Sequence, residues 1–261
     1  MRQPQTAPVF PIRTRPAALP GTTRSLLTTS SIPPNPPSGS GVWAVIVAAG
    51  RGERLGTEHP KAFAKLGDRP LLAESLERLD SSDWIEEIVV VAPAGWEEPA
   101  ILLAEELGCS KVSSCVAGGA TRGDSVRAGV SEVPDDAAVI LVHDAARPLL
   151  PEGVVERLLA PLAEHWDGAV PGLPVADTVK RVRGDEVAET LARDELVVVQ
   201  TPQAFTADVL RRALGGDVAG ASDCSALVEA AGGQVKVVPG DPRLLKVTTA
   251  EDLELVESWL S

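Results

Sequence analysis

The chain has 261 residues, of which 44% are hydrophobic and 23% are charged, and its formal net charge is −13. This length suits one large α/β domain or two small ones, and the composition is that of a globular protein, which excludes a wholly disordered chain. The acidic charge argues against a general nucleic-acid binder, and no apolar run approaches the roughly 18 residues of a membrane-spanning helix.

Residues 1–41 differ from the rest of the chain. They hold nine of the 22 prolines and four arginines but no acidic residue, so the remaining residues carry a formal charge of −17. We expect a disordered N-terminal extension followed by one domain over 42–261. The Arg- and Ser/Thr-rich composition is similar to that of an organelle transit peptide, but a simple tail or an upstream start is the favoured interpretation.

The three cysteines, Cys109, Cys115 and Cys224, are sparse and irregularly spaced. Such a set is neither a disulfide framework nor a zinc site, and it suits a reducing compartment. The expected location is therefore the cytoplasm, with an organelle as the alternative if residues 1–41 are a transit peptide.

From residue 42 onward, short apolar runs alternate with amphipathic patterns. Strands are predicted at 42–47, 87–92, 111–117, 138–143, 168–171 and 235–238. Helices are predicted at 70–80, 96–107, 123–132, 151–165, 206–214, 223–232 and 249–260. Strands rich in Val and Ile that alternate with such helices indicate a largely parallel sheet covered on both faces. Ligands of such sheets bind beyond the carboxyl ends of the strands, which points to the loops after residues 47, 92, 117 and 143.

Residues 173–200 break this alternation. They are predicted to form two extended segments around a Gly184-Asp185 turn, with no helix to cover them. An uncovered ribbon of this kind usually finds a partner, often another subunit.

The loop after the first predicted strand carries small residues and two spaced cations, Arg54 and Lys61. Its glycines fit neither the dinucleotide fingerprint nor the P-loop, because the third glycine comes one residue late and no lysine follows Gly56. Backbone N–H groups of such a loop can approach a polyphosphate, and the two cations can neutralise it. The alternative is a solvated turn with ordinary surface charges.

Five segments in order carry a more specific resemblance. They are Ala-Ala-Gly-Arg-Gly-Glu-Arg at 48–54 with Pro60-Lys61, Gly-Gly-Ala-Thr-Arg-Gly-Asp-Ser at 118–125, His-Asp-Ala-Ala-Arg-Pro at 143–148, Gln-Thr-Pro-Gln at 200–203 and Leu-Lys-Val-Thr at 245–248. Over residues 42–260 the chain resembles the 2-C-methyl-D-erythritol 4-phosphate cytidylyltransferases of the non-mevalonate isoprenoid pathway. The resemblance implies a Rossmann-like nucleotidyltransferase fold, which is a three-layer α/β sandwich with a mostly parallel sheet and a projecting β-arm that forms a homodimer.

The resemblance also implies the roles of individual residues. It assigns catalysis to Arg54, Lys61, Arg193 and Lys246. It assigns CTP binding to Ala48, Ala49, Gly50, Gly52, Gly118, Gly119, Ser125 and Ala145. It assigns acceptor binding to Arg147, Asp177, Thr178 and Thr201. It assigns Mg²⁺ binding to Asp144, with Asp223 as a further candidate. The implied reaction needs no general base, because the attacking group is a phosphate that is already mostly ionised near pH 7.

Purely structural alternatives stay open for three of these residues. Asp144 could be a turn or cap residue, Ser125 an ordinary first-turn serine, and Arg193 a solvated arginine on an exposed ribbon. His143 alternates to the other face of its strand and is expected to be a satisfied core residue. Thr248 with Glu251 matches a capping box for the last helix, and Lys246 is expected to end a short strand before it.

Two departures from the family's usual pattern bear on metal affinity and on the fit of the sugar phosphate. Ser222-Asp223-Cys224 stands where Thr-Asp-Asp is usual, and Leu244 replaces an asparagine. The alternative functions are a cytidylyltransferase for another polyol phosphate such as ribitol 5-phosphate, a dinucleotide-dependent oxidoreductase, and a non-catalytic dimeric relative.

Overall fold

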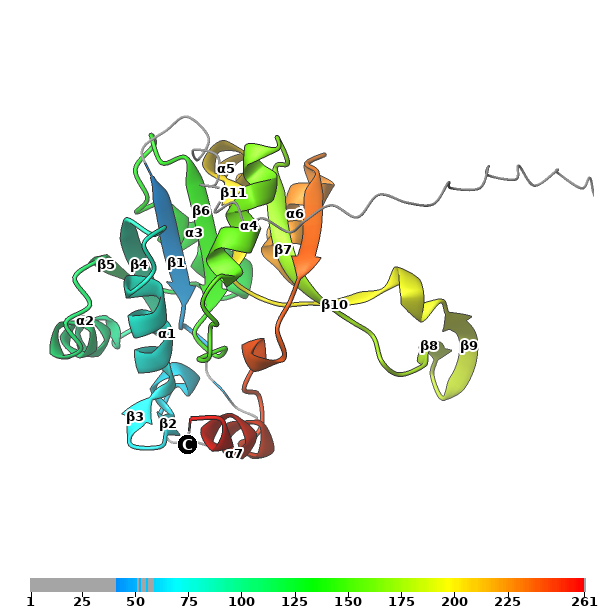
Figure 1. Cartoon of the computed structure of the whole chain (residues 1–261), viewed down its shortest axis with the longest axis horizontal. Coiled ribbons are helices and arrows are strands. Elements are labelled where there is room, and N and C mark those ends of the chain that lie inside the picture. The colour runs from blue at the N-terminus through cyan, green and yellow to red at the C-terminus, as the bar shows by residue number, and fades with distance from the viewer. Residues whose placement is uncertain (1–40, 51, 53–54, 56–58, 261) are drawn as a thin grey trace, which may run out of the picture. The chain divides into compact units, whose positions relative to one another are not determined.

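The structure is a computed structural model that describes residues 41–50, 52, 55 and 59–260. The predictions for residues 1–40 and for Arg54 lie outside these residues. An eight-stranded mixed sheet forms the centre of the domain, in the order β10–β7–β11–β6–β1–β4–β5, with β12 paired to β7 (Figure 1). Its strands are β1 (Val42–Val47), β4 (Glu87–Ala92), β5 (Val112–Ala117), β6 (Val139–Asp144), β7 (Gly168–Pro174), β10 (Val197–Val199), β11 (Gln203–Thr206) and β12 (Val235–Pro239).

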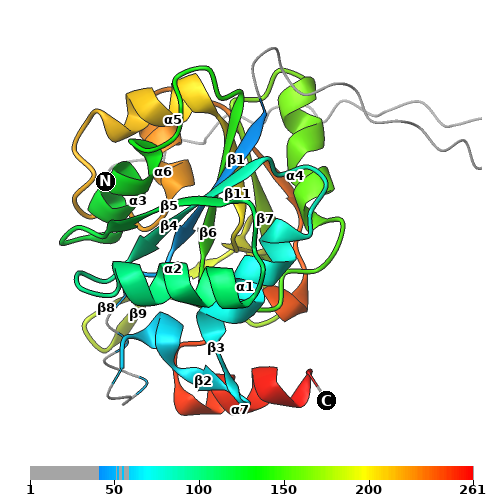
Figure 2. The same ribbon diagram turned by 90° about the vertical axis from the view of Figure 1, so that its left-hand side faces the viewer.

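Helices cover both faces of the sheet, as Figures 1 and 2 show, which confirms the predicted three-layer α/β architecture. They are α1 (Leu71–Asp80), α2 (Glu97–Glu106), α3 (Arg122–Val130), α4 (Val154–Ala163), α5 (Ala207–Leu214), α6 (Cys224–Ala230) and α7 (Ala250–Ser258). Successive strand residues point to opposite faces. Ile46 therefore packs in one core with α1, α2 and α4, whereas Val45 packs in the other with α3, α5 and α6.

Most neighbouring strands run parallel, and the exceptions lie on one side of β6. β1 pairs in parallel with β4 and β6, and β4 with β5. β11, which was not predicted as a strand, lies antiparallel between β6 and β7. The carboxyl ends of β1, β4, β5 and β6 therefore meet at one edge of the sheet, as predicted.

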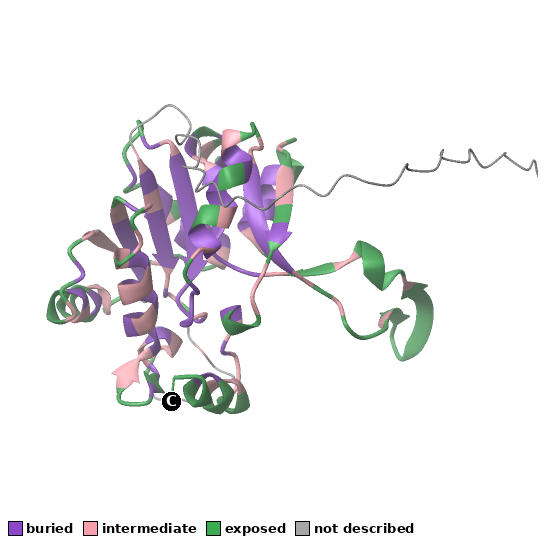
Figure 3. Cartoon of the chain, viewed as in Figure 1, coloured by how far each residue is buried: buried purple, intermediate pink, exposed green. Residues whose placement is uncertain are grey.

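The predicted ribbon around Gly184 is present as β8 (Val179–Arg183) paired antiparallel with β9 (Glu186–Leu191). Its base belongs to the main sheet, where 197–199 pair with 172–174. Figure 3 shows the ribbon as predominantly exposed, and Val182 and Val187 expose 57% and 55% of their surface.

A smaller unit lies beside the carboxyl edge of the sheet. It contains α7 and a short hairpin of β2 (Lys65–Leu66) and β3 (Arg69–Pro70). Leu55, Leu149, Val247 and Val256 are among the buried residues of its separate apolar cluster. Leu55 comes from the loop after β1, Leu149 from the loop after β6, and Val247 from the segment before α7, so the cluster ties three loops together.

Two local predictions near the end of the chain are wrong by small margins. The capping box of α7 is formed by Thr249 and Asp252, not by Thr248 and Glu251, because the side chain that accepts the Asp252 N–H belongs to Thr249. Lys246 does not end a strand; it follows a 3-10 turn at Pro242–Leu244.

Within the described part of the chain, each helix is too short or too polar to cross a bilayer.

Candidate active site

A cavity of about 630 Å³ opens at the carboxyl edge of the sheet. β1 and β6 run side by side there, with Val47 in register with Asp144, and the Ala145 N–H donates to the Val47 carbonyl at 3.1 Å. The cavity is lined by Val47, Ala48, Ala49, Gly50, Gly52, Lys61, Ala62, Gly119, Ala120, Thr121, Arg122, Ser125, Asp144, Ala145, Ala146, Lys246 and Thr248.

One wall of this cavity needs small residues. The Gly118 N–H donates to the Ala92 carbonyl at 2.8 Å, and a Cβ atom at Gly118 would lie 2.2 Å from Cβ of Ala49. The hydroxyl of Ser125 accepts from the Gly119 N–H at 3.1 Å and donates to the Thr121 carbonyl at 2.9 Å. Ser125 thus both sits in the first turn of α3 and fixes the backbone of the glycine loop beside the cavity.

The backbone of Lys61 lies beside that of Gly50, which brings Lys61 to the cavity. The Lys61 N–H donates to the Gly50 carbonyl at 3.3 Å. Gly52 has φ +72°, and a Cβ atom there would lie 2.6 Å from Cβ of Lys61. A residue without a side chain is therefore needed at Gly52, both for its backbone conformation and for its approach to Lys61.

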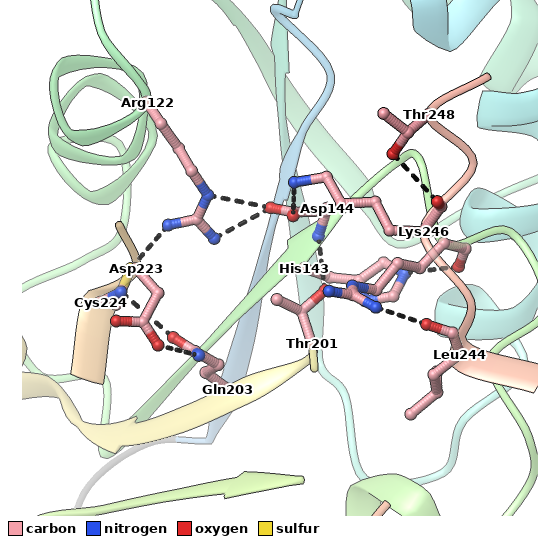
Figure 4. A network of polar contacts seen from close by, with 11 residues as sticks. Arg122, His143, Asp144, Thr201, Gln203, Asp223, Cys224, Leu244, Lys246 and Thr248 are labelled. Carbon is pink, nitrogen blue, oxygen red and sulfur yellow. Dashed lines mark hydrogen bonds and ion pairs between the residues drawn. The ribbon is translucent and has the colours of Figure 1, made fainter. Parts of the chain in front are cut away.

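Asp144 is the centre of the charged network in Figure 4. Its Oδ1 accepts from Nη2 and Nε of Arg122 at 2.9 and 3.1 Å, and its Oδ2 accepts from Nζ of Lys246 at 2.7 Å. Burial favours the neutral acid, but the charges of Arg122 and Lys246 outweigh it and hold the pKa of Asp144 well below its usual range. The carboxyl group is therefore ionised at neutral pH and paired with two cations.

A chain of hydrogen bonds behind Asp144 holds it in place. The Asp144 N–H donates to Oγ1 of Thr201 at 3.0 Å, and this hydroxyl lies 3.3 Å from Nδ1 of His143. Nε2 of His143 lies 3.1 Å from the Arg147 carbonyl oxygen. Burial lowers the pKa of His143 from 6.5 to about 4. A neutral ring with its proton on Nε2 satisfies both contacts, which confirms that His143 is a satisfied core residue.

A second cavity of about 190 Å³ shares Arg122, Asp144 and Lys246 with the first. Its other lining residues are Arg147, Val199, Gln200, Thr201, Gln203, Ser222 and Asp223. Nη1 of Arg147 donates to the Leu244 carbonyl at 2.5 Å, which leaves most of the five donors of this guanidinium for other partners. The three shared side chains thus form a charged boundary between a larger and a smaller cavity.

Asp223 is largely engaged by its own neighbours. Its Oδ1 accepts from the Ala226 N–H at 3.0 Å and so caps α6, while its Oδ2 accepts from Gln203 at 2.7 Å and Ser225 at 2.8 Å. Among the described residues, no group of three or more His, Cys, Asp or Glu side chains could hold a metal ion. Among the carboxylates of the described residues, Asp144 alone lines both cavities.

The structure brings most of the predicted site residues together. The larger cavity holds Ala48, Ala49, Gly50, Gly52, Lys61, Gly119, Ser125, Asp144, Ala145 and Lys246, and the smaller one adds Arg147, Thr201 and Asp223. Gly118 packs against Ala49 without being among the lining residues.

Three predicted residues lie away from both cavities. Asp177, Thr178 and Arg193 are exposed on the segments that lead to and from the ribbon. Nη1 of Arg193 donates to the Ala176 carbonyl at 2.5 Å. The roles assigned to these three residues stay predictions.

Arg122 and Gln203 are site residues that the sequence analysis did not assign. Both stand inside the quoted motifs, so their positions could have drawn attention to them. An arginine in the first turn of a helix is more often solvated, however, and its partner Asp144 lies 22 positions away.

Known proteins resemble this chain over most of its length. A family model described as 2-C-methyl-D-erythritol 4-phosphate cytidylyltransferase matches residues 42–261. A cytidylyltransferase of that description from Nocardia farcinica is 46% identical over 220 residues, which cover 84% of this chain and 94% of that protein. Another from Saccharopolyspora erythraea is 44% identical over 226 residues, covering 84% and 99%.

Solved structures also superpose on this chain, at lower sequence identity. The 2-C-methyl-D-erythritol 4-phosphate cytidylyltransferase of Thermus thermophilus superposes with a TM-score of 0.66 at 33% identity, covering 83% of this chain and 97% of that one. The 4-diphosphocytidyl-2C-methyl-D-erythritol synthase of Anaerococcus prevotii superposes with a TM-score of 0.73 at 26% identity, covering 84% and 98%.

Proposed function

The chain belongs to the family of 2-C-methyl-D-erythritol 4-phosphate cytidylyltransferases, and from this premise we propose how its own residues carry out the reaction. The enzyme transfers the cytidylyl group of CTP to 2-C-methyl-D-erythritol 4-phosphate, giving 4-diphosphocytidyl-2-C-methyl-D-erythritol and pyrophosphate. A phosphate oxygen of the acceptor forms a bond to the α-phosphorus of CTP as the bond between that phosphorus and the pyrophosphate oxygen breaks.

The observation that carries the proposal is the pair of adjoining cavities with a charged boundary. The larger cavity has a wall of small residues and Lys61, which suits the base and triphosphate of CTP. The smaller one has Arg147 and Thr201, which suit a phosphorylated polyol. Lys246 lines both cavities, so its ammonium group can neutralise the acceptor phosphate and the reacting α-phosphate together.

Catalysis in this arrangement rests on position and charge. Phosphoryl-type transfer needs alignment of the two phosphates and neutralisation of charge more than covalent help from the protein. We assign the neutralisation on the triphosphate side to Lys61 and Arg54, the latter from the resemblance alone, and that on the acceptor side to Lys246. No side chain has to remove a proton, since the attacking phosphate is already ionised.

The donor set of the site fits Mg²⁺ bound mainly through the substrate. This ion is commonly held by one or two carboxylates together with substrate phosphates and water. Asp144 offers one ionised carboxylate at the cavity wall, and Asp223 lines the adjoining cavity. When bound, Mg²⁺ would neutralise charge on the triphosphate.

We propose that the enzyme acts as a homodimer through its β8–β9 ribbon. A two-stranded ribbon is at best marginally stable alone, and this one exposes two valines. Arg193, Asp177 and Thr178 are exposed and line neither cavity of their own chain, and they would instead serve the acceptor in the partner's site. We also propose a cytoplasmic location, supported by three free cysteines; fractionation of the source cells tests it.

The first test is pyrophosphate release from CTP with Mg²⁺. We expect turnover with 2-C-methyl-D-erythritol 4-phosphate, none with ribitol 5-phosphate, and loss of turnover in the Lys61→Ala control. Turnover with ribitol 5-phosphate alone would show that the acceptor is a different polyol phosphate, but it would leave the proposed mechanism unchanged. A folded protein without turnover on either acceptor would favour a non-catalytic relative.

A further inference from the structure

Lys61 begins a short 3-10 turn, Lys61–Phe63, and both Lys61 and Ala62 line the larger cavity. Hydrogen-bond geometry in a 3-10 turn is poorer than in an α-helix, so the order of such a turn depends strongly on packing. The hydrogen bond from the Lys61 N–H to the Gly50 carbonyl is also long, at 3.3 Å. The side chains beside Lys61 therefore help to fix where its ammonium group lies.

The indole ring of Trp96 contacts residues on both sides of Lys61. Its centroid lies 4.5 Å from the centroid of the Phe63 ring, and the two ring planes are tilted by 44°. It lies 5.7 Å from the centroid of the His59 ring, in an edge-to-face arrangement with an angle of 63° between the planes. Both distances are within the range of favourable aromatic pairs. Trp96 thus holds the chain two residues before and two residues after Lys61.

Trp96 is itself anchored to the body of the domain. It follows β4 at the carboxyl edge of the sheet and is the N-cap residue of α2, and its N–H donates to the Pro93 carbonyl at 2.9 Å. Trp96 and Phe63 are half-buried, and both pack against the core that contains Ile46. The aromatic contacts therefore connect the turn that carries Lys61 to the core of the domain.

We propose that Trp96 is a positioning residue of the nucleotide site: its ring holds the chain on both sides of Lys61 and so keeps the ammonium group in the larger cavity. Trp96 lines neither cavity, so it acts through Lys61 and need not touch CTP. A lysine held in place favours binding, because the apparent Kd rises as the binding-competent fraction of the protein falls. The inference rests on the proposed function in taking Lys61 as a ligand of the triphosphate.

Calorimetric titration with CTP and Mg²⁺ tests the effect on binding. We expect Trp96→Ala to weaken CTP binding about three- to tenfold, the range that the loss of such aromatic contacts gives. Trp96→Phe keeps a ring against Phe63 and should stay within about twofold of the wild type. KM for the acceptor should stay close to the wild-type value in both variants.

Trp84→Ala is the matched control for Trp96→Ala. Trp84 is also half-buried and packs against the same core, but it precedes β4 and so lies at the opposite edge of the sheet. This variant should lose stability without losing affinity for CTP. If Trp84→Ala weakened CTP binding as much as Trp96→Ala, the proposal would be overturned in favour of a general packing effect.

A double-mutant cycle shows whether Trp96 acts through Lys61. In a Lys61→Ala background the ammonium group is gone, so Trp96→Ala should weaken CTP binding no further. The same fractional loss with and without Lys61 would overturn the proposal. It would also be overturned if Lys61→Ala weakened CTP binding and Trp96→Ala did not.

Amide hydrogen exchange separates this inference from the proposed function. The N–H groups of Phe63 and Ala64 donate to the carbonyls of Pro60 and Lys61 at 2.8 and 3.1 Å, so their exchange reports opening of the turn. Trp96→Ala should speed this exchange, and Trp96→Phe should not. If Lys61→Ala bound CTP as tightly as the wild type, the proposed role of Lys61 would fail, whereas faster exchange in Trp96→Ala would still support the positioning of Lys61 by Trp96. Unchanged exchange in Trp96→Ala would overturn it. If Trp96→Ala fails to fold, Phe63→Leu removes the other ring of the pair and should have the same effects.

Discussion

The ammonium nitrogen of Lys246 lies 2.7 Å from Oδ2 of Asp144, although the two residues are 102 positions apart in the chain. The contact depends on backbone next to each residue. Asp144 ends β6, and the N–H of Val247 donates to the carbonyl of Ala146 at 2.8 Å. Lys246 is thereby held over the end of the strand, at the boundary between the two cavities.

Replacing Lys246 by methionine should reduce catalysis far more than stability. The variant keeps the length of the side chain but removes the charge that the proposed mechanism places between the two phosphates, so we expect kcat to fall about 100-fold or more. Because Lys246 is 42% exposed and Arg122 still pairs with Asp144, the free energy of unfolding should change by about 1 kcal/mol or less. Steady-state kinetics and urea unfolding measure both effects. Lys246→Arg, which keeps the charge, should retain more activity, and a methionine variant with near-normal kcat would contradict the assigned role.

The buried His143 should make the protein less stable in mild acid. Its pKa is about 4 in the folded chain and near 6.5 when exposed, so between these values the unfolded chain binds a proton that the folded chain does not. Stability is therefore full above pH 6.5 and falls as the pH drops toward 4, by about 3 kcal/mol in all.

A His143→Gln variant isolates this contribution, since glutamine can satisfy both hydrogen bonds without titrating. Urea unfolding at pH 7.5 and pH 5.0 should show that the wild type loses about 2 kcal/mol more than the variant. The same pH dependence in both proteins would mean that His143 is protonated in the folded state.

The sequence predicted the fold well where a strand is buried on both faces. Residues 42–47 and 88–92 are continuous apolar runs, and β1 and β4 have the predicted bounds of 42–47 and 87–92. β11 escaped prediction because its four residues, Gln203–Thr206, have no strand-like pattern of their own. Their conformation comes from the place between β6 and β7, which is a tertiary effect.

The site was predictable to the extent that its residues stand in loops after consecutive parallel strands. Lys61, Asp144 and Ser125 meet at the carboxyl edge, as the topology requires. Arg122 could not be assigned in this way, since only the strand order brings the start of α3 next to the end of β6. The sequence identified Cys224 only as a departure from the Thr-Asp-Asp that is usual in the family. Its contact with Arg122 is seen only in the structure.

The close approach of Gly118 to Ala49 should make this glycine intolerant of substitution. In Gly118→Ala the new Cβ atom would start 2.2 Å from Cβ of Ala49, so the loop must move out of place. We expect a loss of about 1–3 kcal/mol of stability, as at other overpacked sites, and a KM for CTP raised about tenfold.

Gly216→Ala is the matched control for Gly118→Ala. A Cβ atom there meets only the Ala213 carbonyl oxygen, at 3.7 Å, an ordinary contact distance. Stability and KM for CTP should therefore stay close to the wild-type values. If Gly118→Ala behaved like this control, the glycine loop would have to be more adaptable than its packing against Ala49 indicates.

Mixed dimers decide whether Arg193 serves the partner's site. Lys61 lines the cavity of its own chain, whereas Arg193 lies outside both cavities, on the exposed segment that follows the ribbon. Lys61→Ala and Arg193→Ala should each be inactive as homodimers. A heterodimer with one variant in each subunit would hold one site that lacks both groups and one that has both intact. Co-expression with two different tags and sequential affinity steps isolates this heterodimer, and it should recover about half of the wild-type activity. If Arg193 instead acted within its own chain, both sites of the heterodimer would lack one group, and the purified heterodimer would stay as inactive as the two parents.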